Sequence, residues 1–309
     1  MDYIVFIVAM GALIYGASFI IKESERIALH FNISHFVIGA TLIAFGTSLP
    51  EMAASMMAAS QGKNDMAVAN VVGSVIFNIT LVLGIVFMIA KSMNPKRDLF
   101  SQDSAWVAVP LMIFFIMVQD GEIGRVDGII FLLIMVSYII FLFSSSKDDL
   151  AGEVDLDVGD EKFAWGKTIL LLAIGFILTI GGANFVVDSG TNIARSLNVS
   201  EWIIGLFLIS LGTSLPELVV SIVAIKKGNA DMSIGNIIGS NVANFSMVLG
   251  GSSLIHPLSV DLAATRFDMF ILTGASLTLL FILANKLYNK AGGIFLLSIL
   301  ALFMQNSFA

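Results

Sequence analysis

The sequence contains no cysteine, and this absence excludes several kinds of chemistry at once. Without cysteine the chain has no disulfides, no thiolate metal site and no cysteine nucleophile. Proline is scarce as well, with five residues in 309, and no low-complexity tract is present. The composition therefore argues against a disordered chain.

Charged residues are also few. They make up 13% of the chain, whereas 57% of the residues are hydrophobic and the mean hydropathy is +0.94. Soluble domains carry roughly 25% charged residues, so this composition indicates a polytopic membrane protein that lies in the lipid bilayer. The formal net charge is −7 and no basic patch is present, so we expect no nucleic-acid partner.

Long apolar runs recur along the whole chain. About 20 apolar residues span a bilayer as a helix, and this rule predicts an all-α polytopic membrane protein with ten transmembrane helices. The N-terminal run lacks a basic region and a small-residue cleavage site, so we expect it to be the first helix and not a removable signal. The predicted spans are 3–21, 35–59, 67–90, 104–119, 127–145, 165–187, 201–225, 232–255, 268–285 and 291–307.

Basic residues are distributed unevenly between the two sets of loops. The loops after the first, third, fifth, seventh and ninth spans carry 12 of the 16 Lys and Arg residues, and the opposite side carries 4. Cytoplasmic loops are enriched in Lys and Arg. We therefore expect a multi-pass protein of the plasma (inner) membrane with both termini extracellular or periplasmic.

One connection, 146–164, is long and acidic, and the distribution of Lys and Arg predicts that it is cytoplasmic. It separates a first five-helix half, 1–145, from a second, 165–309. Its carboxylates raise the possibility of a regulatory Ca²⁺ site. However, Gly159 occupies the position where an EF-hand loop needs its third Asp or Asn ligand, so we interpret the segment as a solvated linker.

The two halves match each other when the sequence is shifted by 166 residues. Residues 39–51 and 205–217 share nine of thirteen identities, including GTSLPE in both. NVVGSVIFN at 70–78 aligns in the same way with NIIGSNVAN at 236–244. A period that covers half the protein indicates a duplication.

The duplication has a consequence for topology. Because five spans is an odd number, the second half enters the membrane from the opposite side. The halves are thus predicted to be inverted repeats, with broken helices at the repeated motifs. Such architectures are typical of secondary transporters, which bind substrate near the midplane where discontinuous helices meet.

Glu51 and Glu217 are the only ionisable residues in the interiors of the predicted spans. An uncompensated charge at mid-bilayer costs roughly 3 kcal/mol or more, so such residues usually face a cavity, a partner or an ion. A single glutamate of this kind could be structural, but two at duplicated positions favour a function. Two close carboxylates cannot both ionise cheaply without a cation between them, and no basic residue lies in a span interior.

Oxygen atoms are concentrated around each glutamate. Thr47 and Ser48 precede Glu51 by four and three residues, which places them on its face if the segment is helical. Pro50 has no N–H, so the carbonyl of Gly46 is expected to lose its helical donor. The second half repeats these residues as Gly212, Thr213, Ser214, Pro216 and Glu217.

Polar pairs spaced by four residues add further oxygens from the neighbouring spans. These pairs are Ser74 with Asn78 and Ser240 with Asn244. For Asn70 and Asn236 we expect hydrogen bonds between helices instead. A set of carboxylate, amide, hydroxyl and carbonyl oxygens suits Ca²⁺, Na⁺ or Mg²⁺, and a cage made only of protein oxygens favours Ca²⁺ over Mg²⁺.

These motifs resemble the α-repeats of the Ca²⁺/cation antiporters, specifically the prokaryotic-type Na⁺/Ca²⁺ exchanger branch. The resemblance covers essentially the whole chain and rests on GATLIAFGTSLPE with NVVGSVIFNITLVLG, and on GLFLISLGTSLPE with NIIGSNVANFSMVLG. The related proton-coupled exchangers usually carry G-N-x-x-E where this chain has G-T-S-L-P-E. This difference favours Na⁺ as the coupling ion.

By position, the resemblance implies a set of ion ligands. The carboxylates would be Glu51 and Glu217, with Asn78 and Asn244 at the centre. Well-known exchangers commonly carry Asp at the position of Asn244, so the site here would have a formal charge of −2 instead of −3. The remaining oxygens would come from Ala44, Thr47, Ser48, Ser74, Ser210, Thr213, Ser214 and Ser240.

The resemblance also implies the function, which is exchange of Ca²⁺ for Na⁺ across the membrane by alternating access. Ca²⁺ and Na⁺ would be substrates, and we expect no cofactor, no enzymatic activity and no protein partner. An H⁺-coupled or other divalent-cation antiporter is the first alternative, and a channel is another. An intramembrane enzyme with two carboxylates is disfavoured, because an acid and a base need unequal environments and these two are near-copies.

Overall fold

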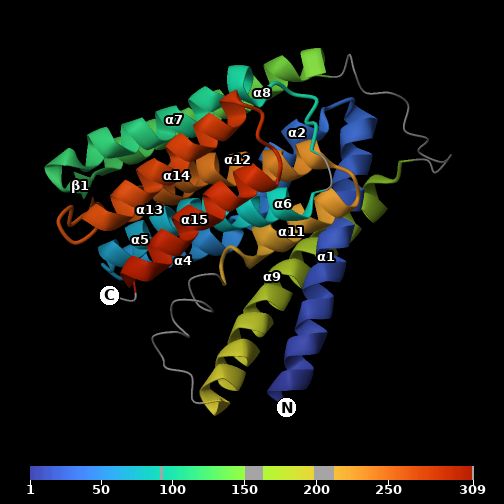
Figure 1. The fold of residues 1–309 in the computed structure, drawn as a ribbon, viewed down its shortest axis with the longest axis horizontal. Helices are drawn as coiled ribbons and strands as arrows, with labels where there is room; N and C mark the ends of the chain where they lie inside the picture. The colour runs from blue at the N-terminus through green and yellow to red at the C-terminus, as the bar shows by residue number, and fades with distance from the viewer. Residues whose placement is uncertain (91–92, 150–162, 198–211, 308–309) are drawn as a thin grey trace. The chain divides into compact units, whose positions relative to one another are not determined.

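The computed structural model describes residues 1–90, 93–149, 163–197 and 212–307, and these ranges are almost entirely helical (Figure 1). The first half contains α1 (Asp2–Phe31), α2 (His35–Ile38), η1 (Gly39–Ile43), α3 (Ala44–Thr47), α4 (Leu49–Ser60), α5 (Asn64–Phe77), η2 (Asn78–Val82), α6 (Leu83–Ile89), α7 (Leu99–Met117), η3 (Val118–Asp120), β1 (Glu122–Ile123) and α8 (Arg125–Asp149). The second half contains α9 (Trp165–Ser196), α11 (Leu215–Lys226), α12 (Ala230–Ala243), η6 (Asn244–Leu249), α13 (Gly250–Ile255), β2 (Leu258–Ser259), α14 (Arg266–Ala284) and α15 (Lys290–Ser307).

Six helical segments within the described ranges are long and apolar enough to cross a membrane, which confirms a helical membrane protein. A seventh candidate is the pair His35–Thr47 and Leu49–Ser60, which is bent by 46° at the break. Part of the predicted span 201–225 lies outside the described residues. The six segments are Asp2–Phe31, Asn64–Ile89, Leu99–Asp120, Arg125–Ser145, Trp165–Ser196 and Arg266–Ala284.

Helix α1 extends well beyond its predicted boundaries of 3–21. It continues to Phe31 through a polar turn that contains Glu23 and Arg26. The Glu23 side chain is fully buried, and its Oε1 lies 3.4 Å from an Arg26 guanidinium nitrogen. Apolar length sets only the part of a helix that lies in lipid, so hydropathy underestimates a helix that continues into the protein's own packing.

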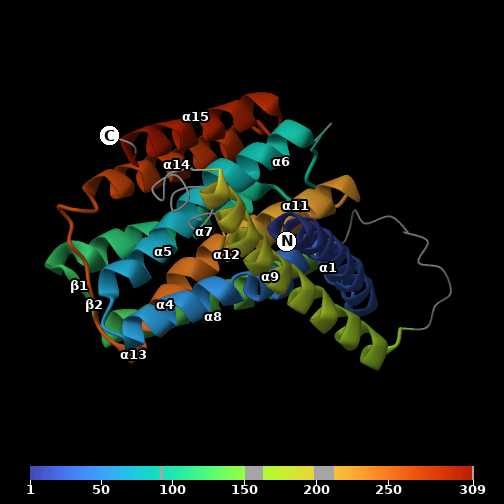
Figure 2. The same ribbon diagram turned by 90° about the horizontal axis from the view of Figure 1, so that it is seen from below.

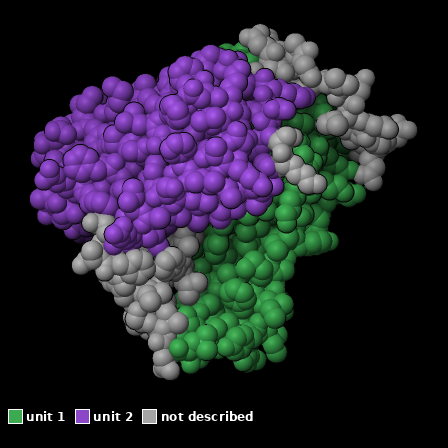
Figure 3. Space-filling model, viewed as in Figure 1, with its two compact units in different colours: residues 1–47, 141–236 green, residues 48–140, 237–309 purple. Residues whose placement is uncertain are grey.

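Contacts divide the chain into two compact units (Figure 3). Unit 1 comprises residues 1–47 and 141–236, and unit 2 comprises 48–140 and 237–309. Each unit therefore combines segments of both sequence halves. Most of the acidic linker, 150–162, lies outside the described residues.

Unit 1 is built on the pair α1 and α9, which run side by side in both ribbon views (Figures 1 and 2). Glycines allow the two helices to approach closely. A Cβ atom on Gly16 would come within 2.6 Å of Thr179 Oγ1, and one on Gly182 within 2.8 Å of the backbone nitrogen of Leu13. Small residues at helix interfaces are the usual means of tight packing in membranes.

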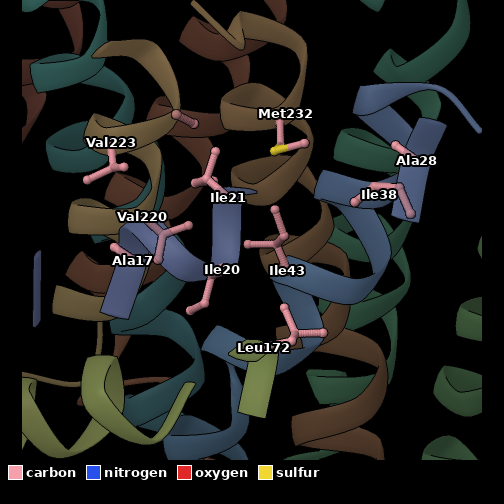
Figure 4. Close-up of a cluster of buried hydrophobic side chains, with 11 residues drawn as sticks. Ala17, Ile20, Ile21, Ala28, Ile38, Ile43, Leu172, Val220, Val223 and Met232 are labelled. Carbon is pink, nitrogen blue, oxygen red and sulfur yellow. The ribbon is translucent and has the colours of Figure 1, made fainter. Parts of the chain in front are cut away.

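The core of unit 1 connects this pair to the helices that carry the repeated motifs (Figure 4). Ile20 and Ile21 of α1 pack with Ile43 of η1 and Val220 of α11. At the end of α11, Lys227 Nζ donates a hydrogen bond to the Ser18 carbonyl at 2.9 Å, and burial lowers the pKa of this lysine. These contacts fix α11 against α1.

Unit 2 contains a buried ion pair that the sequence did not predict. Arg97 Nε lies 2.7 Å from Asp103 Oδ2, and a second guanidinium nitrogen lies 3.3 Å from Oδ1. Both side chains are almost fully buried. The bidentate pair ties the segment before α7 to the first turns of that helix. Burial raises the pKa of Tyr288 to about 12, and the negative charges of Asp98 and Asp103 contribute to this increase.

Candidate cation-binding site

Each GTSLPE segment places its glutamate in the first turn of a short helix. α4 and α11 both have 12 residues, and both begin with Leu, Pro and Glu. Ser48 precedes α4 with φ −84° and ψ 3°, and Ser214 precedes α11 with φ −89° and ψ 2°. Proline fits the first turn because its missing N–H has no intrahelical acceptor there. The sequence repeat is therefore also a repeat of local structure.

Glu51 and Glu217 are both about 1% exposed. Each lies at the N-terminal end of its helix, where the helix dipole favours a negative charge. A carboxylate held in this way at membrane depth is suited to face a cation.

The helix break changes the prediction that Thr47 lies on the same helical face as Glu51. α3 ends at Thr47 and α4 begins at Leu49, so Thr47 and Glu51 do not lie on one continuous helical face. Thr47 Oγ1 instead lies 3.3 Å from the Ala44 carbonyl and 3.3 Å from Asn236 Oδ1.

The sequence predicts that the Gly46 carbonyl and its equivalent, the Gly212 carbonyl, lose their helical donors. The Gly212 carbonyl accepts a hydrogen bond of 3.4 Å from the backbone N–H of Leu215. This i to i+3 contact belongs to the turn that directly precedes α11. Pro216 cannot supply the helical i+4 donor, but the Gly212 carbonyl has a donor in the turn and is not left free.

Wide π-helical turns adjoin the motifs, and periodicity did not predict them. Asn78 begins η2, and Asn244 begins η6 at the equivalent position. A third such turn, η1, precedes the break in the first half. π turns shift the register of side chains and occur frequently at functional sites.

Asn70 and Asn236 form the predicted hydrogen bonds between helices. Asn70 Nδ2 donates to Ser55 Oγ at 2.8 Å and to the Glu51 carbonyl at 3.2 Å. Asn236 Nδ2 donates to Ser221 Oγ at 3.0 Å in the same way. Each asparagine thus fixes the helix that carries a motif glutamate against the next helix along the chain.

Unit 2 holds one part of the predicted ligand set. Helix α4, with Glu51, and helix α5 both pack against η6, which begins at Asn244. Three of the polar atoms are buried and receive no hydrogen bond from any described residue: Asn78 Oδ1, Asn244 Oδ1 and Ser240 Oγ. The buried ligand candidates of this unit are Ser48, Glu51, Ser74, Asn78, Ser240 and Asn244.

Unit 1 holds the other part. Ala44, Thr47, Ser214 and Glu217 are buried, and Thr213 is half-buried. Ser214 Oγ has no hydrogen-bond partner among the described residues. The remaining predicted ligand, Ser210, lies outside the described residues.

The oxygen atoms available as ligands fit a hard cation. Within the described ranges, no group of three or more His, Cys, Asp or Glu side chains is arranged to hold a metal ion. The buried polar atoms are instead amide, hydroxyl and carboxylate oxygens, which suit Ca²⁺ and Na⁺.

Asn241 belongs to this cluster, although sequence reasoning missed it. Asn78 Nδ2 donates a hydrogen bond of 3.2 Å to Asn241 Oδ1, and both side chains are buried. The equivalent residue of the first half is Val75. Comparison of repeats selects what the halves share, so a polar residue present in only one half was overlooked. That mismatch was the available signal.

Known proteins match this chain along nearly its whole length. A family model described as sodium/calcium exchanger protein matches residues 1–144 and 167–309. The chain is 35% identical over 287 residues to an uncharacterized membrane protein of Methanocaldococcus jannaschii, covering 93% of this chain and 90% of the relative.

Two exchangers are also similar. The sodium/calcium exchanger MaX1 of Methanosarcina acetivorans is 28% identical over 322 aligned positions, covering 92% of this chain and 91% of that protein. The solved structure of the sodium-calcium exchanger NCX_Mj, soaked with zero Na⁺ and Ca²⁺, matches with a TM-score of 0.82 at 31% identity. The match covers 99% of this chain and 98% of that one.

Proposed function

The chain belongs to the sodium/calcium exchanger family, and from this premise we propose how its residues exchange Ca²⁺ for Na⁺ across the membrane. The protein is an Na⁺/Ca²⁺ antiporter. We propose that it works by alternating access, with the ions bound in an oxygen cage to which each sequence half contributes one glutamate.

The observation that carries the proposal is the repetition of one local structure around a buried carboxylate. Glu51 and Glu217 each lie in the first turn of a 12-residue helix, directly after a proline and three residues after a serine, and each is about 1% exposed. A single buried glutamate in a membrane helix has many explanations. Two in copied surroundings support a site built from both halves, as in transporters with repeated folds.

The exchange follows from charge balance. The two glutamates give the cage a formal charge of −2, which one Ca²⁺ or several Na⁺ can offset in competition. An empty pair of buried carboxylates is costly to enclose away from water. The cage is therefore stable in an occluded state only when it is loaded, and this requirement couples the two ions without covalent chemistry or catalysis.

The remaining oxygens of the cage complete the ion's shell. We propose backbone oxygens from Ala44, Thr47, Ser210 and Thr213, and hydroxyl oxygens from Ser48, Ser74, Ser214 and Ser240. Asn78 and Asn244 supply amide oxygens, and support for both comes from their burial and from their Oδ1 atoms without a donor among the described residues.

The proposed topology follows the sequence repeat. It has ten transmembrane helices in two inverted halves, 1–145 and 165–309, joined by the cytoplasmic linker 146–164. Both termini lie on the extracellular or periplasmic side of the plasma (inner) membrane. The uneven distribution of Lys and Arg supports this orientation.

Transport by reconstituted protein tests the function directly. Proteoliposomes loaded with Na⁺ should take up ⁴⁵Ca²⁺ when diluted into Na⁺-free buffer, and not when Na⁺ is equal on both sides. Glu51→Gln and Glu217→Gln should each abolish this uptake, because removal of one carboxylate leaves the cage with half of its charge. Glu122→Gln, at an exposed glutamate, is the matched control and should transport normally.

The same experiment separates the alternatives. Uptake that ignores the Na⁺ gradient and follows a pH gradient would identify an H⁺-coupled antiporter. Uptake that persists in Glu51→Gln would remove the glutamate pair from the mechanism.

A further inference from the structure

Asn241 lies next to the proposed cage, and the residue type at this position differs between the two sequence halves. Asn241 is the third residue from the C-terminal end of α12 and stands three positions before Asn244. The side chains of Asn241 and Asn244 therefore lie on the same side of the helix. Its equivalent in α5 is the buried residue Val75. Only the second half therefore contributes an amide at this position.

The hydrogen bond from Asn78 fixes how that residue presents its amide. Asn78 Nδ2 donates to Asn241 Oδ1 at 3.2 Å, which leaves Asn78 Oδ1 buried without a donor among the described residues. An amide oxygen in this state is a suitable ligand for a cation. A buried acceptor without any partner destabilises the protein, and a bound cation would supply the missing partner.

The orientations of the two amides are linked. If Asn241 alone were reversed, its NH₂ group would face the NH₂ group of Asn78, and two donors cannot bond to one another. If both were reversed, Asn78 would present NH₂ instead of oxygen to its surroundings and would repel a cation. The orientation of Asn241 therefore decides whether Asn78 can be a ligand.

We propose that Asn241 is a positioning residue for ion binding, which holds Asn78 with its amide oxygen directed to the transported Ca²⁺. The proposal rests on the proposed function, because it assigns a task to Asn241 only if Asn78 binds the ion. It adds a contributor that the repeat does not duplicate, and it makes the two halves of the cage chemically unequal.

The test compares two substitutions at position 241. Asn241→Val copies the first half and removes the acceptor, so Asn78 is free to turn. Asn241→Asp has the same shape and can only accept, so it must hold Asn78 in the proposed orientation. We expect Asn241→Val to raise the half-saturating Ca²⁺ concentration about tenfold, the equivalent of one ligand interaction of about 1.4 kcal/mol, with a maximal rate within about twofold of wild type. Asn241→Asp should stay near wild type or bind more tightly.

A double substitution shows whether Asn241 acts through Asn78. In the Asn78→Ala background, Asn241→Val should have no further effect on the half-saturating Ca²⁺ concentration, because the residue it positions is gone. Ser252→Ala is the matched control, since Ser252 is fully buried in α13 and its hydroxyl has no partner among the described residues. It should leave transport unchanged.

The outcomes are distinct. A full additional loss in the Asn78→Ala background would overturn the proposal, as would a fall in maximal rate and melting temperature without a change in Ca²⁺ dependence. An equal loss in Asn241→Asp and Asn241→Val would overturn it too. Wild-type protein without Na⁺-driven uptake would instead refute the proposed function, so the two failures can be told apart.

Discussion

Asn244 shows how one atom can set the charge of the proposed cage. It begins η6, is buried, and carries an Oδ1 atom without a hydrogen-bond donor among the described residues. An aspartate would fit the same space with an added negative charge. Helix α4 packs against η6 within unit 2, so that charge would be introduced close to the helix that carries Glu51.

We predict that Asn244→Asp makes Ca²⁺ binding strongly dependent on pH. An aspartate at position 244 adds a carboxylate to a cage that already holds glutamates, and the repulsion between like charges raises the pKa of one of these carboxylates. At low pH a proton then competes with Ca²⁺ for the cage, and at high pH the added negative charge attracts Ca²⁺. The ratio of half-saturating Ca²⁺ concentrations at pH 6 and pH 8 should increase about tenfold over wild type, which corresponds to one shifted pKa unit.

Initial rates of ⁴⁵Ca²⁺ uptake over a range of Ca²⁺ concentrations at the two pH values supply the measurement. Asn285→Asp, at the exposed asparagine that caps the C-terminal end of α14, adds the same charge far along the chain and should leave the ratio unchanged. Equal ratios in wild type and Asn244→Asp would show that position 244 does not contribute to the cage.

The buried polar residues of the chain were not equally predictable from the sequence. Glu51, Glu217 and the hydrogen-bonding roles of Asn70 and Asn236 could be predicted, because a polar residue in an apolar run, repeated at a fixed distance, is visible in the letters alone. The burial of Asn241 and Asp103 could not. Asn241 is bonded by Asn78 and Asp103 by Arg97, and only the packing of the chain brings these partners together.

At the scale of elements, the break in the span 35–59 was predictable, and the chain forms a bent pair there. The π turn η1 in the first part of this pair was not predicted. Hydropathy averages over many residues and cannot register one extra residue in a turn. A proline in the motif indicated a break, but proline also occurs in straight first turns, so its presence alone did not define the geometry.

Close helix crossing in unit 1 leads to a prediction about Gly39. A Cβ atom at this position would collide with the Met232 carbonyl and lie 3.1 Å from the backbone nitrogen of Asn236. Gly39→Ala should therefore force η1 away from α12 and weaken the contact between Thr47 and Asn236. We expect a loss of about 1–3 kcal/mol in stability, typical of overpacking, together with reduced transport.

Gly73 is the matched control for this substitution. It lies inside α5, and beyond its chain neighbours and the backbone of its own helix turn, a Cβ atom there would meet no heavy atom of the described residues within 4 Å. Gly73→Ala should stabilise the helix by up to about 1 kcal/mol, because alanine is the better helix former. Thermal unfolding in detergent, followed by tryptophan fluorescence, compares the two. A melting temperature of Gly39→Ala at or above that of Gly73→Ala would refute the packing argument.

At the scale of the whole molecule, the duplication is visible in the backbone as well as in the sequence. α5 and α12 both have 14 residues and start 166 positions apart, as do α4 and α11 with 12 residues each. Gly62 and Gly228 are also 166 apart, and both adopt left-handed angles, with φ of 71° and 85°. The sequence predicted this repeat because identical motifs fold alike. Whether the second copy is inverted depends on the number of spans between equivalent points, and backbone geometry within one copy carries no record of that number.

The natural absence of cysteine makes the inversion testable with single added thiols. Lys63 and Asn229 occupy equivalent positions, and both follow the motif helix of their half. In an inverted repeat they face opposite sides of the membrane, whereas in a parallel repeat they face the same side. The distribution of basic residues predicts that position 63 is external and position 229 is cytoplasmic.

We therefore expect a membrane-impermeant maleimide to label Lys63→Cys in spheroplasts and Asn229→Cys only in inside-out vesicles. The unmodified chain is its own blank, since it offers no thiol to the reagent. Ala151→Cys, in the acidic linker, should be labelled from the same side as Asn229→Cys, because two spans lie between them in the proposed topology. Labelling of positions 63 and 229 from one side would establish a parallel duplication, and opposite labelling in the reverse sense would retain the inversion but reverse the orientation of the whole molecule.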